Sequence, residues 1–315
     1  MRVSVVICTK NRVQELVNCV KSVFAQSVSP HEVIIVDASD KDEAYLKIRE
    51  EFPKDSRLKY IRSTHVSHIT ADRNVGVRNS SGDIILFLDD DTILDKDFIK
   101  EIVEIFEKDS EKGIGGVTGN IINIDEPKTV MRKLRVNLSL LMKRIFLLPT
   151  HGNGRFRSSG CPTFLYGARE KKDVESLSGC NMAYRKQVFN YLKFDEDFPE
   201  LYIDDEDFSR RVSQRYRNVY TPNAKLIHRR SPVGSASPRV ATPYTRTRRT
   251  VKSRYYLLKK NFPHTLKHTL AFWWSVVGMF GQAVMTMNLE NVKGVISGVS
   301  EMKEIGSKLP KRNAP

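Results

Sequence analysis

The fold is decided by the stretch Asp83-Ile84-Ile85-Leu86-Phe87-Leu88-Asp89-Asp90-Asp91-Thr92. The run Ile84–Leu88 is wholly apolar, which is typical of a strand buried on both faces of a parallel sheet. Three carboxylates follow at once, and like charges this close repel one another strongly unless a cation or abundant water is present. The stretch therefore predicts a buried strand of an α/β domain that ends in a charged, functional turn.

The sequence around this stretch alternates strand and helix patterns. Apolar runs predict strands, and apolar residues three or four apart predict helices. The predicted strands are Val3–Cys8, Glu32–Val36, Leu58–Ile61 and Asp83–Leu88, and the predicted helices are Val13–Gln26, Glu43–Phe52, Ala71–Asn79 and Phe98–Lys108. This order predicts a parallel sheet with right-handed crossovers, whose functional groups gather at the carboxyl ends of the strands.

The rest of the chain predicts a less regular arrangement. We expect further strands at Gly115–Ile124, Val174–Tyr184 and Val219–Ile227, and helices at Thr129–Leu148, Glu206–Arg217 and Arg254–Lys260. His151–Lys172 and Ser231–Thr250 are rich in small, polar and basic residues and predict flexible loops. These patterns predict a main domain over residues 1–230, a flexible basic loop and helix over 231–260, and an apolar helical extension over 261–315.

The charge of the chain is concentrated in one region. The net charge is +15, and no carboxylate occurs between Asp207 and Glu290, a stretch with sixteen lysines and arginines. Such a field favours an anionic partner, namely nucleic acid, anionic lipid or a phosphorylated substrate, although a solvated basic face is the alternative. The four cysteines show no CxxC or zinc-site spacing, so we expect reduced thiols in a cytosolic protein.

Thr269–Leu289 carries no charge and contains Trp273, Trp274 and Phe280. Its length is borderline for crossing a bilayer, and its glycines weaken that interpretation. We expect a helix or helical hairpin that lies at a membrane surface, where tryptophan and flanking lysines are favourable. A single span over 269–289, or a helix buried in a core or a dimer contact, is the alternative.

Three groups of residues carry the candidate chemistry. Asp89 and Asp91 lie one pleat apart, and their oxygens suit a hard divalent ion, Mg²⁺ or Mn²⁺, although an acidic turn capping the next helix is the alternative. Asp204–Asp207 is an acidic cluster at a predicted helix start: it matches the helix dipole, or it supplies a general base. His228 ends an apolar strand and is either structural or a ligand that completes the shell of an ion held by Asp91.

Together these features resemble glycosyltransferase family 2, over most of the chain from Val3 to about Lys260. The similar segments are Val5–Arg12, Val33–Ser39, Ala71–Gly76, Asp89–Asp91, Ser178–Arg185, Phe194–Phe198 and Asp204–Arg211. Two positions depart from the usual pattern: Asp72 stands in place of the more usual alanine, and Asp204 in place of the more usual glutamate.

The resemblance implies a GT-A fold, which is a Rossmann-like mixed sheet flanked by helices, here followed by a helical membrane-associating extension. Residues 1–125 would form the half that binds the nucleotide sugar and 126–230 the acceptor half. The implied donor-binding residues are Thr9, Asn11, Arg12, Asp37, Arg73, Asp89 and Asp90, the metal ligands Asp91, His228 and Asp89, and the acceptor-side residues Gly179, Asn181 and Asp204. Asp205 would be the catalytic base. If the motif is aligned two residues further along the chain, Asp207 would be the base instead.

The resemblance also implies an activity: transfer of a sugar, with inversion, from a nucleoside diphosphate sugar to an acceptor hydroxyl. With the basic tract and Thr269–Leu289, it favours a lipid-linked glycan or lipid phosphate acceptor at the cytoplasmic face of the cell membrane, in cell-surface polysaccharide or glycoprotein glycan assembly. The chain is also compatible with a homodimer. The alternatives are an inactive membrane scaffold of the same fold and a metal-dependent nucleotidyltransferase. A nucleic-acid-binding module is disfavoured, because the acidic turn would repel phosphate and aromatic residues are not interleaved with the basic ones.

Overall fold

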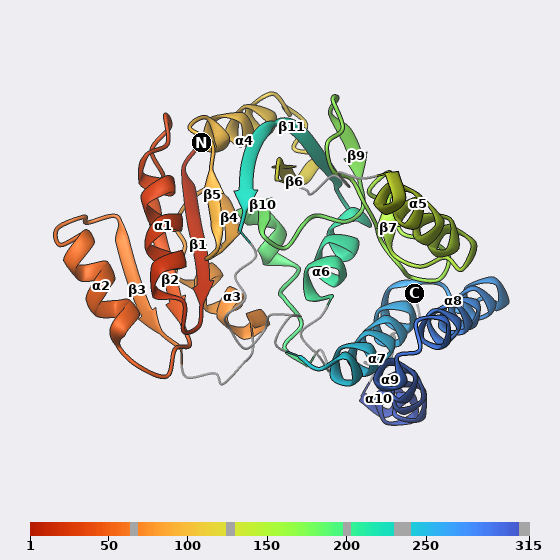
Figure 1. Cartoon of the computed structure of the whole chain (residues 1–315). Coiled ribbons are helices and arrows are strands. Elements are labelled where there is room, and N and C mark those ends of the chain that lie inside the picture. The colour runs from red at the N-terminus through yellow and green to blue at the C-terminus, as the bar shows by residue number, and fades with distance from the viewer. Residues whose placement is uncertain (64–68, 124–129, 198–202, 230–240, 309–315) are drawn as a thin grey trace. The chain divides into compact units, whose positions relative to one another are not determined.

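The computed structural model describes residues 1–63, 69–123, 130–197, 203–229 and 241–308 (Figure 1). Its contacts divide the chain into two compact units. The first unit comprises Met1–Ile124, Leu165–Glu196 and Phe208–Val240, and the second comprises Asp125–Phe164, Asp197–Asp207 and Ala241–Pro315. Part of the predicted loop Ser231–Thr250, namely 231–240, lies outside the described residues.

The first unit is built on one mixed sheet in the order β3-β2-β1-β4-β10-β6-β11-β5, with β9 paired to β11. Its strands are β1 (Val3–Thr9), β2 (Glu32–Asp37), β3 (Leu58–Arg62), β4 (Ile84–Asp89), β5 (Thr92–Leu94), β6 (Ile114–Ile121), β9 (Lys172–Val174), β10 (Asn181–Arg185) and β11 (Arg217–His228). The four strands β3, β2, β1 and β4 run parallel, and β10 is antiparallel to both of its neighbours. The predicted strand–helix alternation and parallel sheet are confirmed for this half of the sheet.

Helices cover both faces of this sheet. The helices of the unit are α1 (Val13–Phe24), α2 (Glu43–Glu51), α3 (Ile69–Arg78) and α4 (Phe98–Glu107), with a 3-10 turn, η1 (Lys186–Asn190), after β10. The apolar residues of α1, α2 and α4 pack with one set of alternate strand residues. Residues of α3 and η1, with Phe208 and Val212, pack with the other set. This period of two is what a strand buried on both faces requires.

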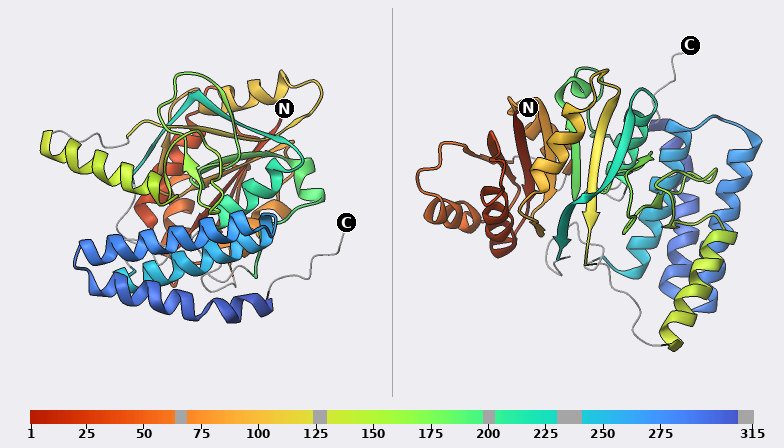
Figure 2. Two further views of the ribbon diagram at one scale, coloured as in Figure 1. Left: turned by 90° about the vertical axis from the view of Figure 1, so that its right-hand side faces the viewer. Right: turned by 90° about the horizontal axis from the view of Figure 1, so that it is seen from above.

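The second unit is mainly helical. It contains α5 (Val130–Ile145), the short paired strands β7 (Thr150–His151) and β8 (Thr163–Phe164), α7 (Pro243–Asn261), α8 (Leu266–Met285), α9 (Leu289–Ser300) and α10 (Met302–Lys308). Helices α7, α8 and α9 run side by side (Figure 2). Their core includes Tyr256, Leu257, Phe272 and Val295. Helix α6 (Asp204–Ser213) has its first turn in this unit and the rest in the first unit.

Three predictions about secondary structure need correction. The strand predicted over Val174–Tyr184 begins only at Asn181, after the short β9. His151–Lys172 is not wholly loop, since it contains strand residues. Residues 243–250 of the predicted flexible loop are helical: Thr242 caps α7 by accepting a hydrogen bond from the backbone N–H of Thr245, and Pro243 stands at the first helical position, where proline is favoured.

The apolar segment Thr269–Leu289 is confirmed as helical. It forms most of α8, and the chain turns into α9 at Leu289. Among the residues that the structure describes, no helix combines the length and the apolar character needed to cross a bilayer.

Candidate active site

The candidate site of the first unit lies at the carboxyl ends of three neighbouring parallel strands. Thr9 of β1 pairs with Asp37 of β2, and Cys8 pairs with Asp89 of β4. The pairing of these strands therefore places their terminal polar residues side by side at the carboxyl edge of the sheet, as predicted. The antiparallel pairing of β11 with β5 places His228 opposite Thr92, directly after Asp91.

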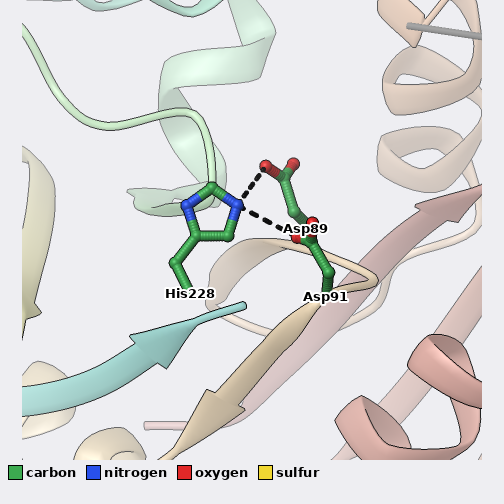
Figure 3. A group of neighbouring side chains, drawn as sticks. All are labelled: Asp89, Asp91 and His228. Atoms are coloured by element: carbon green, nitrogen blue, oxygen red, sulfur yellow. Dashed lines mark ion pairs between the residues drawn. The ribbon is translucent and has the colours of Figure 1, made fainter. Parts of the chain in front are cut away.

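His228, Asp89 and Asp91 form a cluster (Figure 3). The Nε2 atom of His228 lies 3.0 Å from Oδ1 of Asp91 and 3.8 Å from Oδ2 of Asp89. Asp91 is buried, and the other two side chains are partly open to solvent. One nitrogen and two carboxylate oxygens within 4.8 Å of one another form a donor set that fits a divalent ion.

The backbone around this cluster is held in place by hydrogen bonds. Asn123 accepts a hydrogen bond from the N–H of His228 at 2.9 Å and donates one to its carbonyl at 2.9 Å. The N–H of Arg229 donates to the carbonyl of Asp91 at 2.9 Å. These contacts fix the end of β11 against the acidic turn, and the contacts of Nε2 with Asp91 and Asp89 orient the imidazole.

The imidazole of His228 is strongly basic in this setting. Burial favours its neutral form, but hydrogen bonding to Asp91 and Cys180 and the charge of Asp89 outweigh burial and raise its pKa to about 11. An ion bound here would compete for the same nitrogen and would release a proton.

Asp90 takes a different position from its two neighbours. It accepts hydrogen bonds from Oγ1 of Thr9 at 2.6 Å and from Nη1 of Arg12 at 2.8 Å. Burial raises its pKa to about 7. The same guanidinium lies 3.5 Å from Oδ2 of Asp91. Asp90 thus fixes the turn between β1 and α1, and its contact with a donor, like that of Thr9 and Arg12, stays a prediction.

Asn11 joins that turn to the segment after β2. It adopts a left-handed conformation (φ 56°), which asparagine tolerates better than most residues. Its backbone N–H donates to Oγ of Ser39 at 2.7 Å, and its side chain exchanges two hydrogen bonds with Asp40. These hydrogen bonds therefore connect the loop after β1 to the loop after β2 at the carboxyl edge of the sheet.

Asp37 is fully buried and already has three donors. They are the N–H of Ser39 (2.7 Å), the hydroxyl of Tyr60 (2.6 Å) and Nη1 of Arg62 (2.7 Å). Tyr60 and Arg62 were not among the predicted site residues, because nothing in the sequence shows that β3 delivers both side chains to Asp37. The contact of Asp37 with a nucleobase stays a prediction, and such a base would have to share or replace one of these donors. Arg62 is the most exposed of them.

Arg73 and Asn74 anchor α3 to other parts of the site. Arg73 is buried, donates to the carbonyl of Gly179 at 3.4 Å, lies 3.9 Å from Asp89 and stacks over the ring of Phe194. Asn74 exchanges hydrogen bonds with the backbone of Phe194. The structure thus brings together two of the predicted site residues, Gly179 and Arg73.

Asn181 has a structural partner for its side-chain oxygen. This oxygen accepts hydrogen bonds from Oγ1 of Thr118 at 2.7 Å and the N–H of Gly119 at 2.6 Å, which ties β10 to β6. The side chain is fully buried. The contact of Asn181 with an acceptor stays a prediction.

The first turn of α6 holds four acids with unlike surroundings. Asp204 and Asp205 are half-buried, whereas Glu206 and Asp207 are buried. Burial, reinforced by the charge of Asp205, raises the pKa of Glu206 well above its usual range. Asp207 accepts from Nδ2 of Asn261 at 2.7 Å and pairs with Nζ of Lys260 at 3.0 Å, both at the end of α7. Asp205 is the more accessible of the two base candidates.

A cavity of about 420 Å³ lies at the opposite edge of the sheet, at the amino-terminal ends of β1 and β4. Arg2, Asp83, Lys112 and Lys186 are among its lining residues. None of the predicted site residues lines it, so we do not assign the donor to it.

Comparison with known proteins identifies the class and then the family. Two solved structures are similar over almost the whole chain: S. aureus TarS in complex with UDP-GlcNAc (TM-score 0.59, 16% identity, covering 98% of this chain and 84% of that one) and the mannosyltransferase PcManGT from Pyrobaculum calidifontis in complex with GDP-Man and Mn²⁺ (TM-score 0.57, 14% identity, 96% and 87%). The expected GT-A fold is therefore confirmed.

The family model "Glycosyl transferase family 2" matches residues 4–192, more than half of the chain. The chain belongs to this family. The glucosyl-dolichyl phosphate glucuronosyltransferase of Haloferax volcanii is 28% identical over 119 residues, which are 37% of this chain and 38% of that protein. Matches to the first curated relatives span between 18% and 39% of those proteins' own lengths.

Proposed function

We propose that the chain transfers a sugar, with inversion, from a nucleoside diphosphate sugar to an acceptor hydroxyl. The observation that carries the proposal is the meeting of Asp89, Asp91 and His228 at the carboxyl edge of a GT-A sheet, although His228 is far from both in sequence. One similar structure, TarS, binds UDP-GlcNAc, and another, PcManGT, binds GDP-Man and Mn²⁺. Both support a nucleotide-sugar donor. Membership of family 2 supports the reaction class.

The cluster supports a divalent ion, Mg²⁺ or Mn²⁺, held by Asp91 and His228 with help from Asp89. Carboxylate oxygens suit both ions, and the imidazole nitrogen favours Mn²⁺. A bound ion of this kind acts as a Lewis acid that neutralises the charge on a leaving diphosphate. Arg73, buried beside Asp89, adds a fixed positive charge for the donor phosphates.

The base in this proposal is Asp205. Asp205 is half-buried, whereas Asp207 is buried and bound by Lys260 and Asn261, so Asp205 is the more accessible carboxylate for the proton of the acceptor hydroxyl. Attack by that hydroxyl forms the new glycosidic bond as the bond to the diphosphate breaks, and a single displacement of this kind inverts the anomeric centre. Asp204, Gly179 and Asn181 stay proposed acceptor-side residues.

The acceptor in this proposal is a lipid-linked glycan or a lipid phosphate in cell-surface polysaccharide or glycoprotein glycan assembly. A relative named for a dolichyl phosphate substrate and the carboxylate-poor stretch after Asp207 support it. Attachment to the cytoplasmic face of the cell membrane fits that acceptor and the four free cysteines.

The test is thermal shift and nucleoside diphosphate release with a panel of sugar nucleotides, with and without Mn²⁺ or Mg²⁺. We expect one donor class to stabilise the protein only with metal, and Asp91→Asn to lose both responses. Asp95→Asn, at an exposed acid four residues further along, is the matched control. Release of pyrophosphate would favour a nucleotidyltransferase, and no response to any donor would contradict the proposal.

A further inference from the structure

The outer face of α8 is exposed and apolar along its whole length. The exposed apolar residues recur at helical spacing: Leu266, Leu270, Trp273, Trp274, Val277, Phe280 and Val284. Leu270 is 59% and Val277 53% exposed. A helix that faces water normally carries charged residues on this side, but α8 has none after Lys267. The opposite side, with Phe272, Ser275 and Val276, is buried in the helical core.

Helix α5 extends this surface. The indole Nε1 of Trp274 donates to the carbonyl of Ile145 at 2.8 Å, and its ring stacks on Phe146 with centroids 5.0 Å apart. Gly278 permits this approach, since a Cβ atom there would lie 2.3 Å from Phe146. Leu138, Leu141 and Ile145 of α5 are exposed as well. We call these three residues, together with the seven of α8, the apolar patch.

We propose that the apolar patch docks the chain on the surface of an anionic lipid bilayer, with α8 lying in the headgroup region. This surface takes no part in the proposed sugar transfer. Tryptophan is favoured at the boundary between headgroups and acyl chains, and apolar side chains along one helix face insert into it.

Charge selects the bilayer over a second copy of the chain. Lys143 and Arg144 lie in the last turn of α5, Lys267 lies in the first turn of α8, and neither α7 nor α8 contains a carboxylate. A symmetric dimer through this face would bring two copies of the same basic helices together, which like-charge repulsion opposes. Anionic headgroups complement the same charges.

Intrinsic fluorescence makes the proposal directly testable, because the chain's two tryptophans are both in the patch. Vesicles of phosphatidylcholine with phosphatidylglycerol should shift the emission to the blue and carry the full chain upward in flotation. Vesicles of phosphatidylcholine alone, or high salt, should weaken both signals.

The double variant Leu270→Glu/Val277→Glu should lose binding at least tenfold. Leu46→Glu is the matched control, since Leu46 lies on α2 in the other unit and is 63% exposed. Equal melting temperatures of the two variants exclude unfolding as the cause. Equal vesicle binding by the two variants, no binding by the unmodified chain, or a dimer that only the double variant dissociates would each overturn the proposal.

Nucleoside diphosphate release measured without vesicles separates this proposal from the proposed function. A chain that binds vesicles but shows no donor-dependent release fails only the proposed function. A chain that is active but does not bind vesicles fails the docking proposal and the proposed membrane attachment, and leaves the proposed sugar transfer standing.

Discussion

Asn261, the last residue of α7, donates from Nδ2 to Oδ1 of Asp207 at 2.7 Å. Its neighbour Lys260 pairs with the other carboxylate oxygen at 3.0 Å. Asp207 is buried and lies two residues after Asp205, on the same first turn of α6. The position of the proposed base therefore depends on the end of a helix in the C-terminal part of the chain.

This dependence predicts a selective loss of catalysis in Lys260→Met. Removing the ammonium leaves a buried carboxylate without that counter-charge, at a cost of about 3–5 kcal/mol in unfolding free energy. We expect kcat to fall at least tenfold, because the turn that carries Asp205 shifts, while the affinity for Mn²⁺ and the donor changes little. Steady-state kinetics and metal titration separate the two effects.

Lys259→Met is the matched control, since Lys259 lies on the same helix and contacts the ring of Tyr255 instead. It should leave kcat nearly unchanged. Equal losses in the two variants would show that Lys260 has no special role in positioning the base.

Asn123 provides a second prediction, because its side chain exchanges two hydrogen bonds with the backbone of His228. Asn123→Ala removes both hydrogen bonds without touching a proposed ligand. Loss of an orienting partner typically weakens metal binding about 10–100-fold, and we expect Mn²⁺ affinity to fall within that range. Electron paramagnetic resonance of added Mn²⁺ measures it.

His228→Ala should bind still more weakly than Asn123→Ala. Asn79→Ala, at an exposed asparagine just after α3 whose side chain donates to the carbonyl of Val75, should match the unmodified chain. Unchanged Mn²⁺ binding in His228→Ala would refute the assignment of the ion to this cluster.

The first hundred residues were predictable because their strands are short, apolar and separated by clear helices. The acidic turn and His228 were also predictable as candidates, since both follow apolar strands. Asn123 was not, because its role comes from the pairing of β11 with β6, and a single asparagine after a strand has no pattern of its own. Arg62, Tyr60, Lys260 and Asn261 were missed for the same reason: each acts through a contact distant in sequence.

The start of α7 shows a different failure. The basic and polar composition predicted a loop, but Thr242 caps the helix and Pro243 is its first residue. The composition of a segment does not show such a cap. The start of α7 is held by packing against α9, where Tyr244, Thr247 and Arg248 approach Gly294. Tertiary contacts override weak local signals of this kind.

Two glycines test that packing. A Cβ atom on Gly294 of α9 would lie 2.7 Å from the carbonyl oxygen of Tyr244 in α7, which a backbone cannot easily relieve. Gly281 of α8 has open space instead. We expect Gly294→Ala to destabilise the protein by about 1–3 kcal/mol and Gly281→Ala to stabilise it by about 0.5–1 kcal/mol. Urea denaturation measures both, and a stabilising Gly294→Ala would show that α7 and α9 do not pack this closely.

Glu301, just after α9, links stability to pH. Although burial opposes ionisation, hydrogen bonds from Lys252, Ser297 and Arg248 lower its pKa from 4.5 to about 2. The unfolded chain therefore binds a proton more readily than the folded one, so stability falls as the pH drops from 4.5 towards 2. Glu301→Gln should cost about 2 kcal/mol at pH 7, and this difference should shrink below pH 4.5.

Glu290→Gln breaks only an exposed pair with Lys293 and should cost less than about 0.5 kcal/mol at any pH. Urea denaturation at a series of pH values compares the two variants. A Glu301→Gln deficit that persists undiminished at pH 3 would show that this carboxylate is not stabilised by its charge.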